Sequence, residues 1–278
     1  MMPTDKKTFK ERLTLKKILS SMGAYRLYER WLWQQVKGGA KPEHIAIILD
    51  GNRRWANEQE SNPLLMQDKW GHKHGADTVE QLLDWCRMLD VKYVTLYTFS
   101  TENFARKPEE VEKIMQIAEE RFRKLLKDER VHRDKVHVKI IGRVNLLPKS
   151  LQEAIEDVEK ATADYDCYFW NFAFAYGGRA EIVDAAKTVA EKVKSGELDI
   201  ADVSESTFEK YLYTAHMDKQ DPDMIIRTSG EERLSGFLLW QAAYSELLFL
   251  DVYWPDFRRI DLLRAIRTFQ QRKRRFGA

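Results

Sequence analysis

A short stretch around residue 50 places polar and charged side chains directly after an apolar run. Residues 45–49 are apolar and mostly β-branched, which is typical of a buried parallel strand. The chain then continues with Asp50, Asn52, Arg53 and Arg54. Ligands of open α/β sheets bind at the carboxyl ends of the strands, so these side chains are candidates for binding or catalysis. An Asp-Gly pair after a strand is commonly just a turn, and the local pattern leaves that alternative open.

Arginine recurs at two further predicted strand ends, at Arg106 and at Arg227 with Arg233. A guanidinium group binds phosphate oxygens in pairs, so several arginines favour a ligand with more than one phosphate. Ser229 and Gly230 could add backbone N–H groups for an anion. The sequence has no phosphate-binding loop of the P-loop type and no dinucleotide-binding glycine motif after the first strand. A nucleotide-cleaving P-loop site and a dinucleotide site are therefore not expected.

The residues that could bind a metal favour magnesium over zinc. His72 and His74 lie two positions apart with no cysteine or further histidine close by, a spacing that does not suit zinc. Asp50 and Glu246 are carboxylates that could hold a hard cation. Magnesium commonly binds one or two carboxylates together with substrate phosphates.

The elements that must position these residues alternate between strands and helices. Helical apolar spacing separates the apolar runs, and a helix is predicted to begin at Gly71 and another at Pro108. We expect residues 57–69, a polar segment, to form a mobile loop. The pattern predicts an α/β fold with a mostly parallel six-stranded central sheet flanked by helices. The predicted strands are 45–49, 91–99, 136–142, 168–176, 223–227 and 247–253.

The chain is predicted to form one catalytic domain, residues 44–278, after an amphipathic helical extension, residues 1–43. Trp31 and the basic residues of the extension would suit either docking on the domain or contact with a membrane surface. Residues 258–275 are rich in lysine and arginine, which indicates a solvated helix face or a contact with a phosphate-bearing partner.

Composition limits the class of protein. The 278 residues are 44% hydrophobic with a net charge of +2, so a large core is available and a general nucleic-acid coat is not expected. Cys86 and Cys167 lie in apolar patterns and are predicted to be buried thiols of a reducing cytosol. No apolar run approaches the ~18–20 residues of a membrane span, and no signal peptide is visible. We therefore expect a cytoplasmic protein.

Taken together, these blocks resemble the cis-prenyltransferases, the family of undecaprenyl and dehydrodolichyl diphosphate synthases. The likeness covers about residues 43–277, in order and with similar spacing, which makes it specific. It implies a hydrophobic tunnel beside the sheet that houses a growing prenyl chain. The all-helical trans-prenyltransferases are not matched, because their paired Asp-Asp-x-x-Asp motifs are absent. The matching blocks are 50–56, 71–73, 99–104, 176–179, 227–231, 233–235, 237–241 and 254–257.

The resemblance implies a role for each block. Asp50 would bind Mg²⁺ and help an allylic diphosphate ionise, and Glu246 would assist the same metal. The residues implied to hold the allylic diphosphate are Gly51, Asn52, Arg53, Arg54 and His72, with Trp55 flanking the substrate. The residues implied to hold isopentenyl diphosphate are Arg227, Arg233, Leu234 and Ser235. A mobile loop between the two sites would consist of Ser100, Thr101, Glu102, Asn103, Phe104 and Arg106.

The residue at the position of Asn103 is often named in this family as the proton acceptor. A neutral amide is a poor base, so we expect Asn103 to orient the reactants while a diphosphate oxygen is the candidate acceptor. The tail residues Arg275 and Gly277 match an Arg-x-Gly ending that, in related enzymes, crosses a dimer to the other subunit. The chain departs from the family at Asp68, where an arginine is expected, and at Glu232, where some bacterial members have histidine. Arg53 replaces a glycine of bacterial members and matches archaeal and eukaryotic ones.

The resulting expectation is a homodimeric, cytoplasmic, membrane-peripheral enzyme that binds Mg²⁺ and no nucleic acid. It would add isopentenyl diphosphate to an allylic prenyl diphosphate, make Z double bonds and release diphosphate, with transient membrane contact for its lipid product. Two alternatives remain open from the sequence. One is a prenyltransferase that uses a non-diphosphate acceptor such as an alcohol. The other is a non-catalytic subunit of a heteromeric synthase, against which the retention of Asp50, Arg227 and Arg233 argues.

Overall fold

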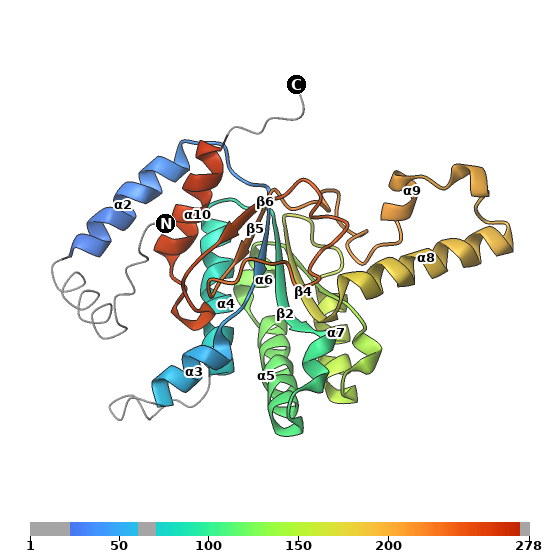
Figure 1. The fold of residues 1–278 in the computed structure, drawn as a ribbon, viewed down its shortest axis with the longest axis horizontal. Coiled ribbons are helices and arrows are strands. Elements are labelled where there is room, and N and C mark those ends of the chain that lie inside the picture. The colour runs from blue at the N-terminus through green and yellow to red at the C-terminus, as the bar shows by residue number, and fades with distance from the viewer. Residues whose placement is uncertain (1–22, 61–70, 273–278) are drawn as a thin grey trace, which may run out of the picture. The chain divides into compact units, whose positions relative to one another are not determined.

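The computed structural model describes residues 23–60 and 71–272 (Figure 1). These fall into two compact units. One contains residues 42–257, and the other combines the described residues before 42 with those from 258 onward. The candidate residues around Asp50, Asn103 and Arg227 all belong to the larger unit.

The larger unit is built on a six-stranded sheet in which every strand pair is parallel. The strand order is β3-β4-β2-β1-β5-β6, which confirms the predicted α/β sheet. Ile48 is level with Tyr97 on one neighbour and with Arg227 on the other, so three strands end close together. The strands are β1 (His44–Ile48), β2 (Tyr93–Ser100), β3 (Val136–Ile141), β4 (Tyr168–Tyr176), β5 (Met224–Arg227) and β6 (Glu246–Phe249).

The central strands are apolar on both sides because both sides are covered. Every residue of β1 is buried, and so are all but the first residue of β4. A strand that faced water on one side would alternate between polar and apolar residues. The continuous apolar runs in the sequence therefore predicted these strands closely.

Helices flank the sheet and connect its strands. Pro108 occupies the first turn of α5, as predicted, and α4 begins at Gly71. Helix α5 packs against α4 and α7, and Figure 1 shows α8 leading away from the sheet toward α9. The helices of this unit are α3 (Asn52–Glu60), α4 (Gly71–Met88), α5 (Pro108–Leu126), α6 (Glu129–Arg133), α7 (Lys149–Ala161), α8 (Gly178–Ser195) and α9 (Glu205–Glu209). Short 3₁₀ helices are η1 (Thr101–Ala105), η2 (Val144–Leu146), η3 (Ile200–Asp202) and η4 (Trp254–Asp256).

Two local predictions were wrong. The segment expected to be a loop from residue 57 is helical as far as Glu60, because the helix that begins at Asn52 continues through it. Its polar composition hid an element whose first turn closes by a hydrogen bond from the Trp55 N–H to the Gly51 carbonyl oxygen. The rest of that segment lies outside the described residues. Cys86 is buried as predicted, but Cys167 is exposed because it precedes β4 in the turn after α7.

The smaller unit pairs α2 (Ala24–Lys37) with α10 (Arg259–Gln271). Leu32 and Val36 are buried, and Arg259 forms an ion pair with Glu29. On the same helix Leu27 is 67% exposed and Trp31 44% exposed. Helix α2 thus has one buried apolar face and keeps further apolar side chains at the surface. Among the described residues, no helix has the length and apolar character needed to cross a membrane.

The lowered pKa values of two histidines lead us to expect that the protein loses stability in acid. His44 is fully buried and bonds Thr95 at 2.8 Å, while His216 bonds Asn171 at 2.7 Å. Burial lowers the pKa of each to about 4, with nearby His137 and Lys139 adding to the effect at His216. Because each folded-state pKa lies below the unfolded value of about 6.5, the unfolded chain binds more protons as the pH falls.

The free energy of unfolding should therefore decline as pH falls from about 6.5 to about 4, by up to ~3 kcal/mol for His44 alone. Urea unfolding at pH 7.5, 6 and 5 measures this. Carboxylates also titrate near the lower limit, so His44→Gln is the matched control, and it should flatten the slope. An unchanged slope in His44→Gln would show that His44 does not carry the effect.

Candidate active site

A cavity of about 790 Å³ lies at the carboxyl ends of β1, β2 and β5. It joins side chains that are as far apart in the chain as Asp50 and Ser235. The predicted site residues that line it are Asp50, Gly51, Asn52, Arg53, Arg54, His72, Ser100, Glu102, Asn103, Arg106, Arg227 and Ser235. Polar residues that were predicted at four separate places in the sequence, 50–54, 72, 100–106 and 227–235, thus meet in one site.

Asp50 and Arg227 form the central ion pair of this cavity. Arg227 Nη2 lies 2.7 Å from Asp50 Oδ2, and Arg54 Nη2 lies 3.4 Å from Asp50 Oδ1. Burial by itself raises the pKa of Asp50, but the hydrogen bond and charge of Arg227 outweigh it and hold the pKa below its ordinary value. Asp50 is therefore ionised at neutral pH.

Arg227 also binds the segment that follows its own strand. Its Nη1 donates to Ser235 Oγ at 2.8 Å and to the backbone oxygen of Arg233. The Arg227 side chain is almost fully buried, so these bonds hold the guanidinium in one orientation. Ser235 adopts a φ of 50°, a left-handed conformation that turns the segment back toward β5.

A second group of charges surrounds Glu231. Arg54 Nη1 lies 3.2 Å from Glu231 Oε1, and Arg54 Nη2 donates to Ser229 Oγ. Arg233 also pairs with Glu231, but its side chain is 63% exposed and does not line the cavity. Arg54 therefore bridges the turn after β1 and the turn after β5.

Glu110, which sequence reasoning did not single out, gathers a third group of basic side chains. Arg106 Nη1 lies 3.0 Å from Glu110 Oε1, His72 Nε2 lies 3.4 Å from it and Arg53 Nε 3.6 Å. Burial lowers the pKa of His72, and the charge of Arg106 lowers it further, which favours the neutral ring. Arg106 precedes α5 in extended backbone and Glu110 lies in the first turn of that helix, so no regular spacing in the sequence signalled this contact.

The segment predicted as a loop after β2 is the 3₁₀ helix η1. Asn103 Oδ1 accepts a hydrogen bond from the Ser100 N–H at 3.0 Å, and the Ser100 side chain accepts one from the Asn103 N–H. This capping box fixes the amide of Asn103 at the rim of the cavity. Phe104 packs edge-on against Phe99 and does not line the cavity.

Close packing holds the turn after β1. Gly51 has a φ of 105°, and a side chain there would meet the Tyr253 ring at 2.7 Å, so only glycine fits. Asn52 donates to the Leu49 carbonyl oxygen at 3.0 Å, while its Oδ1 is buried with no hydrogen-bond partner among the described residues. The Trp55 ring packs against His74. The Asn52 side-chain oxygen is thus an acceptor that a ligand could satisfy.

Glu246 does not join Asp50 within the chain. Glu246 opens β6 and pairs with Met224, level with Ile45. Asp50 lies five positions beyond Ile45 in the parallel direction, which places the two residues about 16 Å apart along the strands at ~3.3 Å per residue. The two carboxylates therefore do not meet within one chain, and the role of Glu246 at the metal stays a prediction. The described residues contain no group of three or more acidic, histidine or cysteine side chains that could hold a metal.

Several other residues differ from the expectation. Trp55, Thr101, Phe104, Arg233 and Leu234 do not line the cavity. Arg275 and Gly277, together with the departure at Asp68, lie outside the described residues. Residues that line the cavity without having been predicted include Asn57, Tyr97 and Thr98. Tyr97 and Thr98 belong to an apolar strand, where no sequence signal separates a core residue from a site residue.

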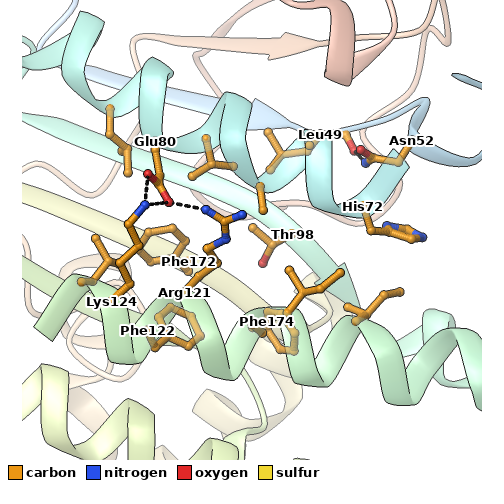
Figure 2. A pocket seen from close by; sticks show the side chains of 18 of the residues that line it. Leu49, Asn52, His72, Glu80, Thr98, Arg121, Phe122, Lys124, Phe172 and Phe174 are labelled. Atoms are coloured by element: carbon orange, nitrogen blue, oxygen red, sulfur yellow. Dashed lines mark hydrogen bonds and ion pairs between the residues drawn. The ribbon is translucent and has the colours of Figure 1, made fainter. Parts of the chain in front are cut away.

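An apolar pocket of about 130 Å³ adjoins the polar cavity. Figure 2 shows Asn52 and His72 at one end and Phe172 and Phe174 along it. The residues shared by the walls of both spaces are Leu49, Asn52, His72, Thr98 and Ile114. A site for anionic groups thus continues into a space lined mainly by apolar side chains of α4, α5 and the sheet.

Comparison with known proteins identifies the family. The model of the undecaprenyl diphosphate synthase family matches residues 48–277. A tritrans,polycis-undecaprenyl-diphosphate synthase (geranylgeranyl-diphosphate specific) of Pyrococcus abyssi is 53% identical over 254 residues, which are 91% of this chain and 94% of that protein. The enzyme of the same name from Methanopyrus kandleri is 54% identical over 254 residues, 91% of each chain.

Solved structures agree with this relationship. A lavandulyl diphosphate synthase from Lavandula x intermedia, in complex with dimethylallyl diphosphate, has a TM-score of 0.79 and 36% identity, covering 86% of this chain and 99% of that one. The structure of a probable undecaprenyl diphosphate synthase from Campylobacter jejuni has a TM-score of 0.68 and 29% identity. The match covers 86% of this chain and 100% of that one. With the phosphate-suited cavity, the apolar pocket and the parallel sheet, these matches show that the chain belongs to the cis-prenyltransferase family of undecaprenyl diphosphate synthases.

Proposed function

We propose that this cis-prenyltransferase condenses isopentenyl diphosphate with an allylic prenyl diphosphate to make a longer Z-polyprenyl diphosphate. The observation that carries the proposal is the continuity between a cavity lined by four arginines and an apolar pocket. The arginines suit diphosphate and the pocket suits a hydrocarbon chain. An amphiphilic phosphate ester is the ligand class that needs both.

The basic groups divide between two diphosphates. Arg53, Arg106 and His72 converge on Glu110 at the end of the cavity that adjoins the apolar pocket, which suits the allylic diphosphate. Arg227 and Ser235 on the β5 side suit isopentenyl diphosphate. Arg54 lies between the two groups, through its contacts with Asp50 and Glu231. Incoming phosphate oxygens would replace the carboxylate partners of these arginines.

Magnesium fits this site with Asp50 as its protein ligand. The Asp50 carboxylate is ionised, partly exposed and faces the cavity, and Mg²⁺ typically combines one or two carboxylates with substrate phosphate oxygens. Bound there, the ion would supply positive charge beside the leaving diphosphate. We do not assign Glu246 to this site.

The residues of the chain account for the remaining chemistry. Departure of diphosphate from the allylic carbon builds negative charge on its oxygens, which Arg53, Arg54 and Arg106 are placed to stabilise. The new bond then forms to the terminal carbon of isopentenyl diphosphate, which loses a proton. Asn103, held by its capping box, orients the reactants, and a diphosphate oxygen accepts the proton.

The proposal extends to the assembly and its surroundings. We propose a homodimer in which the Arg275–Gly277 tail reaches the other subunit, as the family resemblance implies. We also propose that the exposed Leu27 and Trp31 of α2 touch a membrane surface when the lipid product leaves. Binding of the protein to vesicles containing anionic lipid, compared with Leu27→Ser/Trp31→Ser, tests the membrane contact. Equal binding of the two proteins would refute it.

The reaction is tested by incubating the purified chain with labelled isopentenyl diphosphate and a series of allylic diphosphates in Mg²⁺. Geranylgeranyl diphosphate belongs in that series because the archaeal relatives are named as specific for it. Chain-extended diphosphates resolved by length support the proposal. Label transferred only in the presence of an alcohol would support the alternative acceptor, and absence of any product would favour the non-catalytic reading. Chelation of the metal should abolish the extension.

Arg233→Ala should raise KM for isopentenyl diphosphate far more than KM for the allylic primer. The family resemblance assigns Arg233 to isopentenyl diphosphate, and its exposed side chain, paired with Glu231 outside the cavity walls, would turn toward that substrate when it binds. Loss of one charged hydrogen bond of ~1.5–3 kcal/mol corresponds to roughly 10- to 150-fold. Steady-state kinetics with each substrate varied in turn measure the ratio. Arg123→Ala is the control because it removes a similarly exposed arginine paired with Glu119 on α5, outside the cavity walls. Equal changes for both substrates would contradict the assignment.

A further inference from the structure

Tyr253 lies in a segment that supports both halves of the diphosphate site from outside the cavity. The Trp254 N–H donates to the Asp50 carbonyl oxygen at 3.0 Å, and the Val252 carbonyl oxygen accepts a hydrogen bond from the Ser229 N–H at 2.7 Å. These two bonds fasten the segment to the turn after β1 and to the turn after β5. The backbone of Tyr253 is therefore fixed relative to the site.

The Tyr253 side chain contacts two charged residues of α3. The guanidinium carbon of Arg54 lies 5.7 Å from the centre of the Tyr253 ring. The Tyr253 hydroxyl donates a hydrogen bond to Glu58 Oε1 at 2.7 Å. This bond, together with burial, raises the pKa of Tyr253 to about 12, so the hydroxyl keeps its proton at neutral pH and remains a donor.

Arg54 and Glu58 have the spacing of an ion pair within one helix. They lie four positions apart on α3, where side chains of that spacing share a face, and their charges are opposite. In the described part of the chain, however, Arg54 pairs with Asp50 at 3.4 Å and with Glu231 at 3.2 Å. The Glu58 carboxylate binds the Tyr253 hydroxyl instead, and Arg54 lines the diphosphate cavity.

We propose that Tyr253 is a positioning residue that holds Glu58 and so keeps Arg54 directed into the diphosphate cavity. This inference rests on the proposed function, in which Arg54 binds phosphate oxygens. Without the hydroxyl, the Glu58 carboxylate loses its donor, and the basic side chain one helical turn away is Arg54. A pair between Arg54 and Glu58 would then compete with diphosphate for the guanidinium.

The first test is Tyr253→Phe, which keeps the ring beside Arg54 and removes only the hydroxyl. kcat/KM for geranylgeranyl diphosphate should fall about fivefold, because a partly exposed ion pair has to be broken before the phosphate binds. Kd for inorganic diphosphate, measured by titration calorimetry in Mg²⁺, should rise by a similar factor. The thermal midpoint should stay close to wild type because the packing of the ring is kept.

The decisive variant is Tyr253→Phe combined with Glu58→Gln. A neutral amide does not compete for Arg54, so both kcat/KM and Kd should return to within about twofold of wild type. A hydrogen bond with a structural role alone would not be rescued, because the double variant also lacks it. Glu58→Gln by itself should resemble wild type, since the amide oxygen can still accept the hydrogen bond from Tyr253.

Tyr168→Phe is the matched control. It removes a hydroxyl that donates to the Asp90 carboxylate at 3.3 Å, outside the walls of the diphosphate cavity. It should change neither kcat/KM for the primer nor the binding of inorganic diphosphate.

The inference would be overturned if Tyr253→Phe matched wild type in both measurements, or if its losses persisted in the double variant. Failure of Tyr253→Phe to fold would also overturn it, since the hydroxyl would then serve stability. Failure of the wild-type protein to extend any primer would instead refute the proposed function. The binding of inorganic diphosphate requires no turnover, so the two failures can be told apart.

Discussion

Replacing Asp50 by alanine should lower kcat at least ~10³-fold, the ~4 kcal/mol expected for a lost charge-stabilising group. Asp50 is the carboxylate that binds Arg227 at 2.7 Å, and it is ionised because Arg227 and Arg54 lower its pKa. Without it the site loses the proposed protein ligand of Mg²⁺ beside the leaving diphosphate. The effect should appear in kcat at saturating concentrations of Mg²⁺ and both substrates.

Asp50→Asn separates the loss of charge from the loss of shape. The amide can still accept a hydrogen bond from Arg227, so this variant should keep a thermal midpoint close to wild type while its kcat falls nearly as far. The alanine variant should be less stable, because it leaves the buried Arg227 with fewer partners. Turnover within about tenfold of wild type in either variant would show that Asp50 is not required for the ionisation step.

Replacing Arg227 by methionine should lower kcat/KM for isopentenyl diphosphate by roughly 10²- to 10⁴-fold. Loss of two charged hydrogen bonds from the guanidinium to the diphosphate, at ~1.5–3 kcal/mol each, corresponds to that range. Methionine is of similar length and apolar, so the side-chain volume near β5 is largely kept. Initial rates with isopentenyl diphosphate varied at saturating primer measure the change.

Ser235→Ala is the graded control for Arg227→Met. It removes one bond of Arg227, from Nη1 to Ser235 Oγ, and leaves the pair with Asp50. Its effect should be clearly smaller than that of Arg227→Met. Equal losses of activity in the two variants would show that the pair of Arg227 with Asp50 adds nothing to activity beyond the bond of Arg227 to Ser235.

The sequence by itself predicted the strands and the polar residues that follow them. The run 45–49 is apolar throughout because β1 is buried on both faces, and the polar residues from Asp50 onward begin where that burial ends. The same rule located Ser100 and Arg227, which are the last residues of β2 and β5. These signals are local, so a single sequence contains them.

Pattern alone did not reveal helix α3 or the role of Glu110. Helix α3 is polar, and its register depends on contacts made after the chain folds. Glu110 looks in the sequence like an acidic residue in the first turn of α5, a common stabilising position. Only the approach of Arg53 and His72 from other elements identifies it as part of the site.

Which polar residues meet was decided by tertiary structure. Asp50, Asn103 and Arg227 come together because β1, β2 and β5 are adjacent and parallel, so their carboxyl ends share one edge. Glu246 was predicted to share a metal with Asp50. It is the first residue of β6, level with Ile45, and so lies toward the amino ends of the strands, whereas Asp50 follows a carboxyl end. Local residue pattern specifies where a strand begins and ends, whereas strand order and register depend on hydrogen bonds between segments far apart in the chain.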